Sequence, residues 1–340
     1  MKLSTISNII SSTQTQYNTI DLIKFLCAIA VCLIHVPVFP DEPTKLMLYI
    51  NFGFKNYLCR IAVPFFFTVS GFLLFRKMEL YEPNESVIRN YCFKMLRFIG
   101  IWYILLTIGG TVQLWYLGGT VVAVILLSLC LRFRLRLSTI GLIACLLYAV
   151  GLFGDAYYGF VEPLRGIPLI RYIFILYEFF FVTTRNGVFM GFLFVFMGAV
   201  LAHSKFKISL LAAATGFCIS MLLGFAEAYL LQSNGIPAEH NMYLFIPPAV
   251  FFLFLLARDI HLPDHWIYKK LRIWGILIFF LHMYINQAVV FFSGILANRT
   301  GIELAPYRCG LVIMITFSLS VLLEWTSQKE HFKWLQFLYS

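Results

Sequence analysis

The sequence predicts an all-α integral membrane protein that crosses the bilayer many times. Of its 340 residues, 61% are hydrophobic and 12% are charged, which is about half the charged fraction of a soluble domain. Stretches such as 121–130 and 246–257 are apolar on every side, whereas the strands of a membrane barrel alternate polar and apolar residues. Because lipid cannot satisfy backbone groups, these stretches are expected to be helices.

Windows of about 20 residues predict ten membrane-spanning helices. In chain order they are 20–38, 57–75, 92–111, 113–131, 137–154, 186–202, 207–231, 243–258, 273–293 and 307–325. The third and fourth are expected to form a tight hairpin around Gly109, Gly110 and Gln113. We therefore expect a polar N-terminal segment (1–19), one membrane domain (20–326) and a short cytoplasmic tail (327–340).

The basic residues predict the orientation of these spans. With an even number of spans and the N-terminus inside, 18 of the 26 Lys and Arg residues fall on the cytoplasmic side, as the positive-inside rule requires. The net charge of +10 follows from these flanking residues, and no basic and aromatic groove pattern indicates nucleic acid binding. The eight cysteines show no CxxC pair and no clustering with histidine, so no metal site is expected.

The first span carries three ionisable residues on one side. His35 follows Lys24 by eleven residues, so the two side chains share one helix face roughly 16 Å apart. Asp21 falls within about 40° of the same stripe. An ionisable side chain inside a membrane segment indicates a functional site, although a histidine that hydrogen-bonds a neighbouring helix gives the same pattern.

Two later spans add polar candidates near His35. Arg60 stands at the outer end of the second span, the side that His35 approaches, and Ser70 with Gly71 permits close approach of a helix or a ligand. His282, in the ninth span, is a candidate to line the same cavity. A core histidine with a single hydrogen bond is the alternative.

A group of cations lies at the cytoplasmic start of the third span. Lys94 and Arg97 are three residues apart and therefore neighbours on one helix face, with Arg89 close by. Such a group suits the phosphates of a nucleotide-like cofactor. Topogenic charges beside anionic lipid are the alternative.

The longest link between predicted spans, 155–185, is expected to be irregular and extracytoplasmic. It contains Arg165, Arg171, Glu178 and a dense series of aromatic residues. Aromatic side chains with a few charges suit a sugar-stacking platform or a re-entrant lid, and interfacial anchoring is the other interpretation. Glu178 is a candidate to orient the catalytic base.

Five short motifs follow one another along the chain. They are Asp21-Leu-Ile-Lys24 with ten residues before His35, the segment RIAVPFFFTVSGF at 60–72, Lys94-Met-Leu-Arg97, Leu114-Trp115-Tyr116-Leu117 and Ile278-Phe279-Phe280-Leu281-His282. This ordered set resembles acyltransferase family 3 of bacterial membrane O-acyltransferases and covers most of the chain. Lysine stands at 24 and 94 where the family's Arg-x10-His and Arg-x-x-Arg motifs begin with arginine, which preserves charge but loses bidentate geometry. The segment from Arg185-Asn186-Gly187 to Gly198 is also similar to a subgroup whose membrane domain precedes an amino-acid racemase.

The resemblance implies an enzyme of the bacterial cytoplasmic membrane that takes an acyl group, usually acetyl, from cytoplasmic acyl-coenzyme A. The acceptor would be a hydroxyl of an extracytoplasmic or lipid-linked glycan, or of another cell-envelope molecule. By this resemblance His35 is the catalytic base, Lys24 supports it or the cofactor, and Lys94 with Arg97 holds coenzyme A phosphates. From their positions in the sequence, Asp21 is a further catalytic candidate and Arg89 a further cofactor-binding candidate. Candidate acceptor-binding residues are Arg60, Ser70, Trp115, Tyr116, Glu178 and His282. The donor to the thioester oxygen stays open among Lys24, Arg60 and Ser70.

A different class of protein shares some of these features. In a transporter or flippase for a small solute or a lipid-linked sugar, Lys24, His35, Arg60 and His282 would line a solute or proton pathway. The Lys94 and Arg97 pair favours the acyltransferase, since an acyl-coenzyme A enzyme requires phosphate-binding cations there. The other large class of membrane-bound O-acyltransferases places its histidine late, where only His282 would qualify.

Overall fold

A computed structural model of the chain describes residues 17–39, 44–106, 114–236 and 241–340. These residues are helical with connecting turns and contain no β-strand, which confirms the predicted all-α class. The predicted hairpin around Gly109, Gly110 and Gln113 lies outside the described residues, as do positions 1–16 of the polar N-terminal segment.

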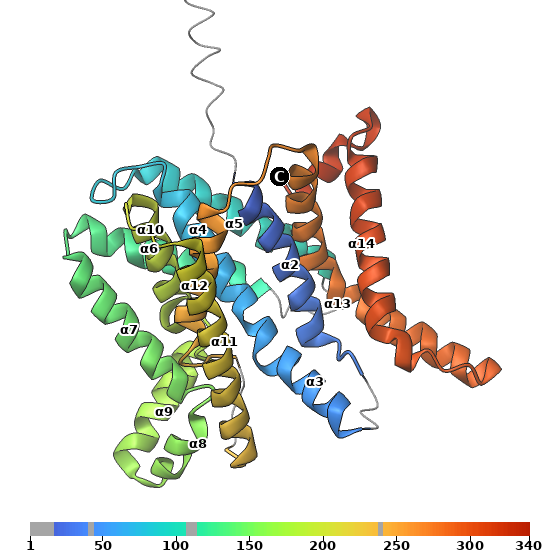
Figure 1. Ribbon diagram of the computed structural model, residues 1–340, viewed down its shortest axis with the longest axis horizontal. Helices are drawn as coiled ribbons and strands as arrows, with labels where there is room; N and C mark the ends of the chain where they lie inside the picture. Colours follow the sequence, from blue (N-terminus) through green and yellow to red (C-terminus); the bar gives the residue numbers. More distant parts are fainter. Residues whose placement is uncertain (1–16, 40–43, 107–113, 237–240) are drawn as a thin grey trace, which may run out of the picture.

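The main helical segments of the described residues carry the labels of Figure 1. In chain order they are α2 (Asn18–His35), α3 (Lys45–Asn56), α4 (Ala62–Phe75), α5 (Glu85–Leu106), α6 (Trp115–Arg132), α7 (Leu137–Phe153), α8 (Tyr158–Val161), α9 (Pro168–Phe181), α10 (Phe192–His203), α11 (Leu210–Ser233), α12 (Ile246–Asp259), α13 (Trp266–Thr300), α14 (Arg308–Ser327) and the 3₁₀ segment η6 (Glu330–Leu338). A short 3₁₀ turn, Leu58–Ile61, precedes α4, and a π-helical turn, Gly187–Gly191, precedes α10.

Each of the ten predicted spans contains a helix, but fewer meet a strict length criterion. In the described parts of the chain, six helical stretches are long and apolar enough to cross a membrane, and a seventh is possible if α7 and the bent segment after it form one span. The stretch Gly187–His203 is apolar but shorter. The protein is therefore a multi-helix membrane protein, and the count of ten and the cytoplasmic termini stay predictions.

Helices α2 and α4 lie side by side in the middle of the bundle. Helix α4 packs against α10, α12 and α6, whereas α2 packs against α13, which in turn contacts α14. Figure 1 shows these two groups on either side of the α2 and α4 pair. It also shows that α2 begins at the end of the molecule where the C-terminus lies, so α2 points His35 toward the opposite end.

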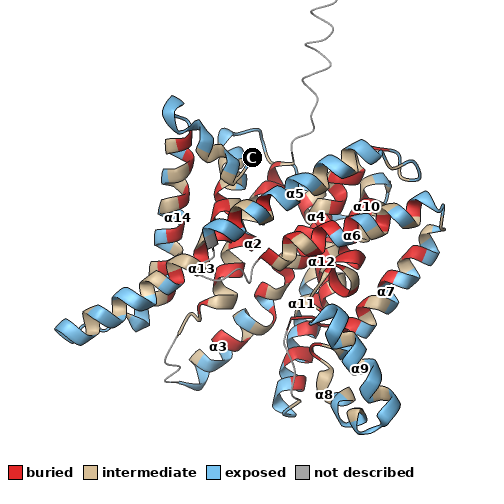
Figure 2. Cartoon of the chain, turned by 180° about the vertical axis from the view of Figure 1, so that it is seen from behind, coloured by how far each residue is buried: buried red, intermediate tan, exposed pale blue. Residues whose placement is uncertain are grey.

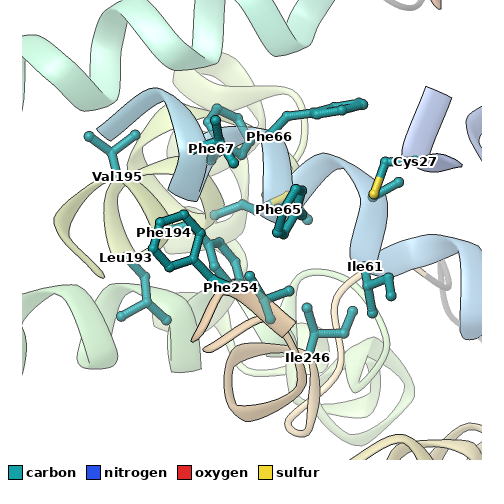
Figure 3. Close-up of a cluster of buried hydrophobic side chains, with 14 of the residues drawn as sticks. Cys27, Ile61, Phe65, Phe66, Phe67, Leu193, Phe194, Val195, Ile246 and Phe254 are labelled. Carbon is teal, nitrogen blue, oxygen red and sulfur yellow. The ribbon is translucent and has the colours of Figure 1, made fainter. Parts of the chain in front are cut away.

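Aromatic side chains fill the centre of the bundle. Phe65 and Phe67 of α4 are completely buried and pack near Phe194 of α10 and Phe254 of α12 (Figure 3). Figure 2 shows that the outer helices, in contrast, consist largely of exposed residues. Leu211 of α11 is 77% exposed. Apolar outer surfaces of this kind require lipid as the surrounding solvent.

Two glycines allow α4 and α10 to approach closely. A Cβ atom added at Gly198 would lie 2.0 Å from the carbonyl oxygen of Thr68, and one added at Gly71 would lie 2.2 Å from that of Val195. Small residues at such crossings permit backbone contact between membrane helices. The helix containing the second-span motif is therefore held against α10 by its glycine, and no larger residue fits.

The structure corrects the expectation that 155–185 is irregular. This stretch contains α8, a 3₁₀ turn and the fourteen-residue helix α9, which begins with Pro168 as its first residue. Proline is favoured in the first turn of a helix because backbone N–H groups there have no acceptor within the helix, so the N–H that proline lacks is not needed. Helix α9 ends where Val182 adopts a φ of 58°. Its aromatic run thus forms a mostly exposed helix, and not an irregular loop.

The C-terminal segment folds back on the bundle. The indole N–H of Trp102 in α5 donates to the carbonyl of Leu338 at 3.2 Å, and the hydroxyls of Ser327 and Tyr339 lie 2.6 Å apart. Arg97 donates to the carbonyl of Ser340 at 2.5 Å. Residues 327–340 therefore cover the end of the bundle at which α2 begins.

Candidate functional site

The last residue of α2, His35, lies beside a small cavity. Its ring centroid is 5.4 Å from that of His282 in α13. The cavity has a volume of about 50 Å³ and we call it the histidine cavity. Its lining residues are Val31, Ile34, His35, Arg60, Val63, Pro64, Trp115, Tyr116, Arg185, Met190, Asn241 and Phe279. Three predicted site residues besides His35 thus meet there: Arg60, Trp115 and Tyr116.

The partner imidazole, His282, is completely buried. Its Nδ1 lies 3.1 Å from the carbonyl oxygen of Ile278, and because a carbonyl can only accept, Nδ1 carries the proton. Nε2 has no hydrogen-bond partner within the described residues. His282 is thus held by its own helix, with one unpaired acceptor nitrogen in the neutral ring.

Two arginines from distant parts of the chain meet in the histidine cavity. Arg60 donates to the side-chain oxygen of Asn241 at 2.6 Å, and Arg185 donates to the same oxygen at 3.0 Å. The amide orientation is set by Asp155, which accepts from the Asn241 backbone N–H at 2.7 Å and from its side-chain amide at 2.9 Å. A second backbone donor, Met242, reaches Asp155 at 2.8 Å.

Local capping places Arg185 at this position. The side chain of Asn186 accepts from the backbone N–H groups of Val188 and Phe189 and so starts the π-helical turn. A Cβ added at Gly187 would lie 2.3 Å from the carbonyl oxygen of Gly119, so this turn abuts α6. Arg185 consequently lies over the ring of Trp115, at 5.3 Å from its centroid.

A larger cavity lies toward the other end of α2. Its volume is about 550 Å³, and we call it the lysine cavity because its cations are Lys24, Lys77, Lys94 and Arg272. Other lining residues include Ser70, Tyr91, Phe98 and Tyr339. Among the described residues that line it, none is Asp or Glu. Lys24 and Lys94, from helices far apart in sequence, therefore face one space without a neutralising carboxylate at its wall.

The two cavities share a wall. Tyr116 of α6 and Phe279 of α13 line both, with their ring centroids 5.7 Å apart. The Ser70 hydroxyl lies 3.3 Å from that of Tyr116. The space that holds Lys24 is therefore separated from the space that holds His35 by aromatic side chains, and the two cavities lie back to back along α2.

Five predicted site residues line neither cavity, and one of them is His282, which contacts His35 but is absent from the cavity wall. Asp21 is buried, with a carboxylate oxygen 3.9 Å from Nε of Arg272. Arg97 is occupied by the C-terminal carbonyl, and Arg89 lines a separate groove between α5 and α6. Glu178 of α9 pairs with Arg165 at 2.8 Å. The structure thus brings together His35, Arg60, Trp115, Tyr116 and His282, and groups Lys24 with Lys94 and Ser70.

A family model described as "Acyltransferase domain" (acyltransferase family 3) matches residues 17–261 of this chain. The chain belongs to acyltransferase family 3. The family match covers His35, Arg60, Lys94 and Arg185, whereas α13 with His282 follows the matched segment. The matched segment contains four of the five motifs and confirms the family resemblance, whereas the fifth motif, at 278–282, follows it.

The curated relatives of this acyltransferase family 3 member are longer proteins. A serine/alanine racemase of Enterococcus gallinarum is 29% identical over 288 residues, which cover 76% of this chain and 40% of the relative. Two amino-acid racemases of Enterococcus faecalis are each 27% identical over about 35–37% of their own length. The chain thus spans about two fifths of the curated relatives it matches. No solved structure matches it.

Several residues of these cavities were not predicted as site residues, and among them Asn241, Arg185 and Arg272 carry polar groups. Asn241 follows a short link and carries no motif, so its contact with two arginines is visible only in the structure. Arg185 stands directly before the Asn186 cap, and a cation at the start of an apolar helix is a signal that could have pointed to it. Arg272 belongs to a basic run with Lys269 and Lys270 that orientation alone explains.

Proposed function

We propose that this protein is a membrane O-acyltransferase that moves an acyl group, most simply acetyl, from cytoplasmic acyl-coenzyme A to an acceptor hydroxyl. The acceptor is an extracytoplasmic or lipid-linked glycan, or another molecule of the bacterial cell envelope, and the enzyme lies in the cytoplasmic membrane. One observation carries the proposal. A cationic cavity and a histidine cavity lie back to back along α2 and share Tyr116 and Phe279.

The lysine cavity suits a coenzyme A donor in size and charge. Its volume of about 550 Å³ is within the range of about 300–1,000 Å³ typical of ligand pockets. Its ammonium and guanidinium groups bind phosphate oxygens through charge-assisted hydrogen bonds. In this proposal Lys24, Lys94 and Arg272 hold the phosphates, and the donor extends toward Tyr116.

The histidine cavity supplies the acid–base chemistry. Acyl-coenzyme A, when bound, offers the acyl group as an activated thioester. His35 accepts the proton of the acceptor hydroxyl as its oxygen attacks the acyl carbon, and the proton can later pass to the departing thiolate. The candidate donors to the thioester oxygen are divided between the cavities: Ser70 and Lys24 line one and Arg60 lines the other.

Removing two of the three lysines of the lysine cavity, Lys24 and Lys94, is expected to abolish donor binding. A double variant, Lys24→Gln with Lys94→Gln, has two fewer cations for the phosphates, and the removal of each charge-assisted hydrogen bond weakens binding by about tenfold or more. Thermal unfolding of purified protein with increasing acetyl-coenzyme A measures this, because a ligand that binds the folded state raises its stability.

The matched control for that experiment is Lys205→Gln, an exposed lysine between α10 and α11. It should keep the wild-type response to acetyl-coenzyme A. If the wild-type protein itself shows no stabilisation by acetyl-coenzyme A and releases no free thiol from it, the donor assignment is wrong and a transporter becomes the better candidate.

A further inference from the structure

The histidine cavity contains more positive charge than the proposed reaction itself requires. We propose that Arg60 and Arg185 together bind an anionic group on the acceptor, a carboxylate or a phosphate, next to the hydroxyl that faces His35. This inference rests on the proposed function, because it names the class of acceptor that the enzyme acylates.

The first observation is the number of unused hydrogen-bond donors. A guanidinium has five N–H donors, yet the guanidinium of each arginine makes one hydrogen bond within the described residues, to the shared Asn241 oxygen. The Nε atoms of both Arg60 and Arg185 are buried without a partner in the described parts of the chain. A buried N–H without a partner is costly, so two of them beside one cavity indicate a missing acceptor group.

The second observation is the charge balance. Neither arginine forms an ion pair with a described residue. The nearby carboxylate, Asp155, is separated from them by Asn241, which accepts from the arginines and donates to Asp155. The two guanidiniums therefore face the cavity with only the Asp155 carboxylate nearby, on the far side of Asn241. A second anion, bound in the cavity, would neutralise the remaining positive charge.

The arginines are also held in place before any ligand binds. Asp155 is completely buried and fixes the Asn241 amide through two hydrogen bonds. The Trp115 ring supports the Arg185 guanidinium through a cation–π contact. Planar guanidiniums held in this way match the geometry of a carboxylate or a phosphate.

The size of the cavity limits how the acceptor enters. A space of about 50 Å³ exceeds the share of one water molecule, about 30 Å³, but is far below typical ligand pockets of about 300–1,000 Å³. It admits one small anionic group and an adjacent hydroxyl, not a whole sugar. We therefore expect the acidic edge of the acceptor to enter while the remainder stays outside.

The test compares three sugars at equal ionic strength. Methyl glucuronide presents a carboxylate, glucose 6-phosphate presents a phosphate, and methyl glucoside is the neutral control. Thermal unfolding of the purified protein should show stabilisation by at least one anionic sugar and not by the glucoside, and acetyl transfer should favour the same sugar. Arg60→Gln and Arg185→Gln should weaken its binding by about tenfold or more, whereas Arg185→Lys should retain part of it.

The control variant is Arg299→Gln, which changes an exposed arginine in the last turn of α13, outside the cavity, and should bind the anionic sugar normally. Retained stabilisation by acetyl-coenzyme A shows that the arginine variants are folded. If neither anionic sugar exceeds the glucoside, or if both glutamine variants bind like the wild type, the inference is wrong. Arginine-dependent sugar binding without any effect of acetyl-coenzyme A would instead keep the anion site and reject the acyltransferase proposal.

Discussion

Replacing His35 with glutamine is expected to lower acyl transfer by about 10²–10⁴-fold, the contribution typical of a general base. Glutamine is close in size to histidine and keeps hydrogen-bonding atoms, but it cannot take a proton from the acceptor hydroxyl at neutral pH. Stabilisation by acetyl-coenzyme A should be unchanged, because Tyr116 and Phe279 separate the lysine cavity from His35. The measurement is the rate of acetyl ester formation together with thermal unfolding in the presence of the donor.

The choice of control decides which histidine acts. His331, exposed in η6, should tolerate glutamine without loss of rate. His282→Gln removes the neighbouring ring, 5.4 Å from His35, and should reduce the rate less than the His35 variant. Full activity of His35→Gln combined with complete loss in His282→Gln would move the role of base to α13.

Adding a single methyl group at Gly198 is expected to destabilise the protein by about 3 kcal/mol or more, the upper range for overpacking. The new Cβ would lie 2.0 Å from the Thr68 carbonyl oxygen and 2.7 Å from the Phe72 backbone nitrogen. Both atoms belong to the backbone of α4, so the helices must separate. Detergent-purified Gly198→Ala should therefore unfold at a lower temperature than the wild type.

The same substitution at Gly310 provides the matched control. Gly310 lies in α14 and an added Cβ there would meet no atom within 4 Å, so Gly310→Ala should keep the wild-type unfolding temperature. If both alanine variants unfold alike, close approach of α4 and α10 does not limit stability. The acyl-transfer rate of Gly198→Ala should also fall, because α4 carries Ser70 and follows directly after the 3₁₀ turn that contains Arg60.

The fold class could be predicted from the sequence because the requirement for helices in lipid is local. Each predicted span contains a helix, since apolarity and length decide that outcome residue by residue. Helices α3 and α9 were missed. Helix α3 continues with the second span as one apolar stretch in the structure, and α9 lies in a link whose aromatic residues suggested a platform. Neither has the isolated run of about 20 apolar residues that identifies a span.

The candidate site was predictable only where one helix carries its parts. The spacing of Lys24 and His35 correctly put both on α2, but the structure places them in different cavities. Lys94 reaches the lysine cavity as the motif suggested, whereas Arg97, one turn along the same helix, binds the C-terminal carbonyl. A sequence motif identifies which residue types occur together along a helix, but it does not determine the direction in which each side chain points.

By itself, the sequence determined that this chain forms apolar helices in a membrane, that it resembles acyltransferase family 3, and that His35 is an ionisable residue near the end of one helix. Tertiary structure decided that Arg60 meets Arg185 and Asn241 around that histidine, and that Tyr116 and Phe279 stand between it and the lysines. The reason is physical. Helix formation depends on neighbours within about four residues. These contacts instead join segments more than 50 residues apart in sequence, and the distance between such segments in space depends on how closely the helices pack.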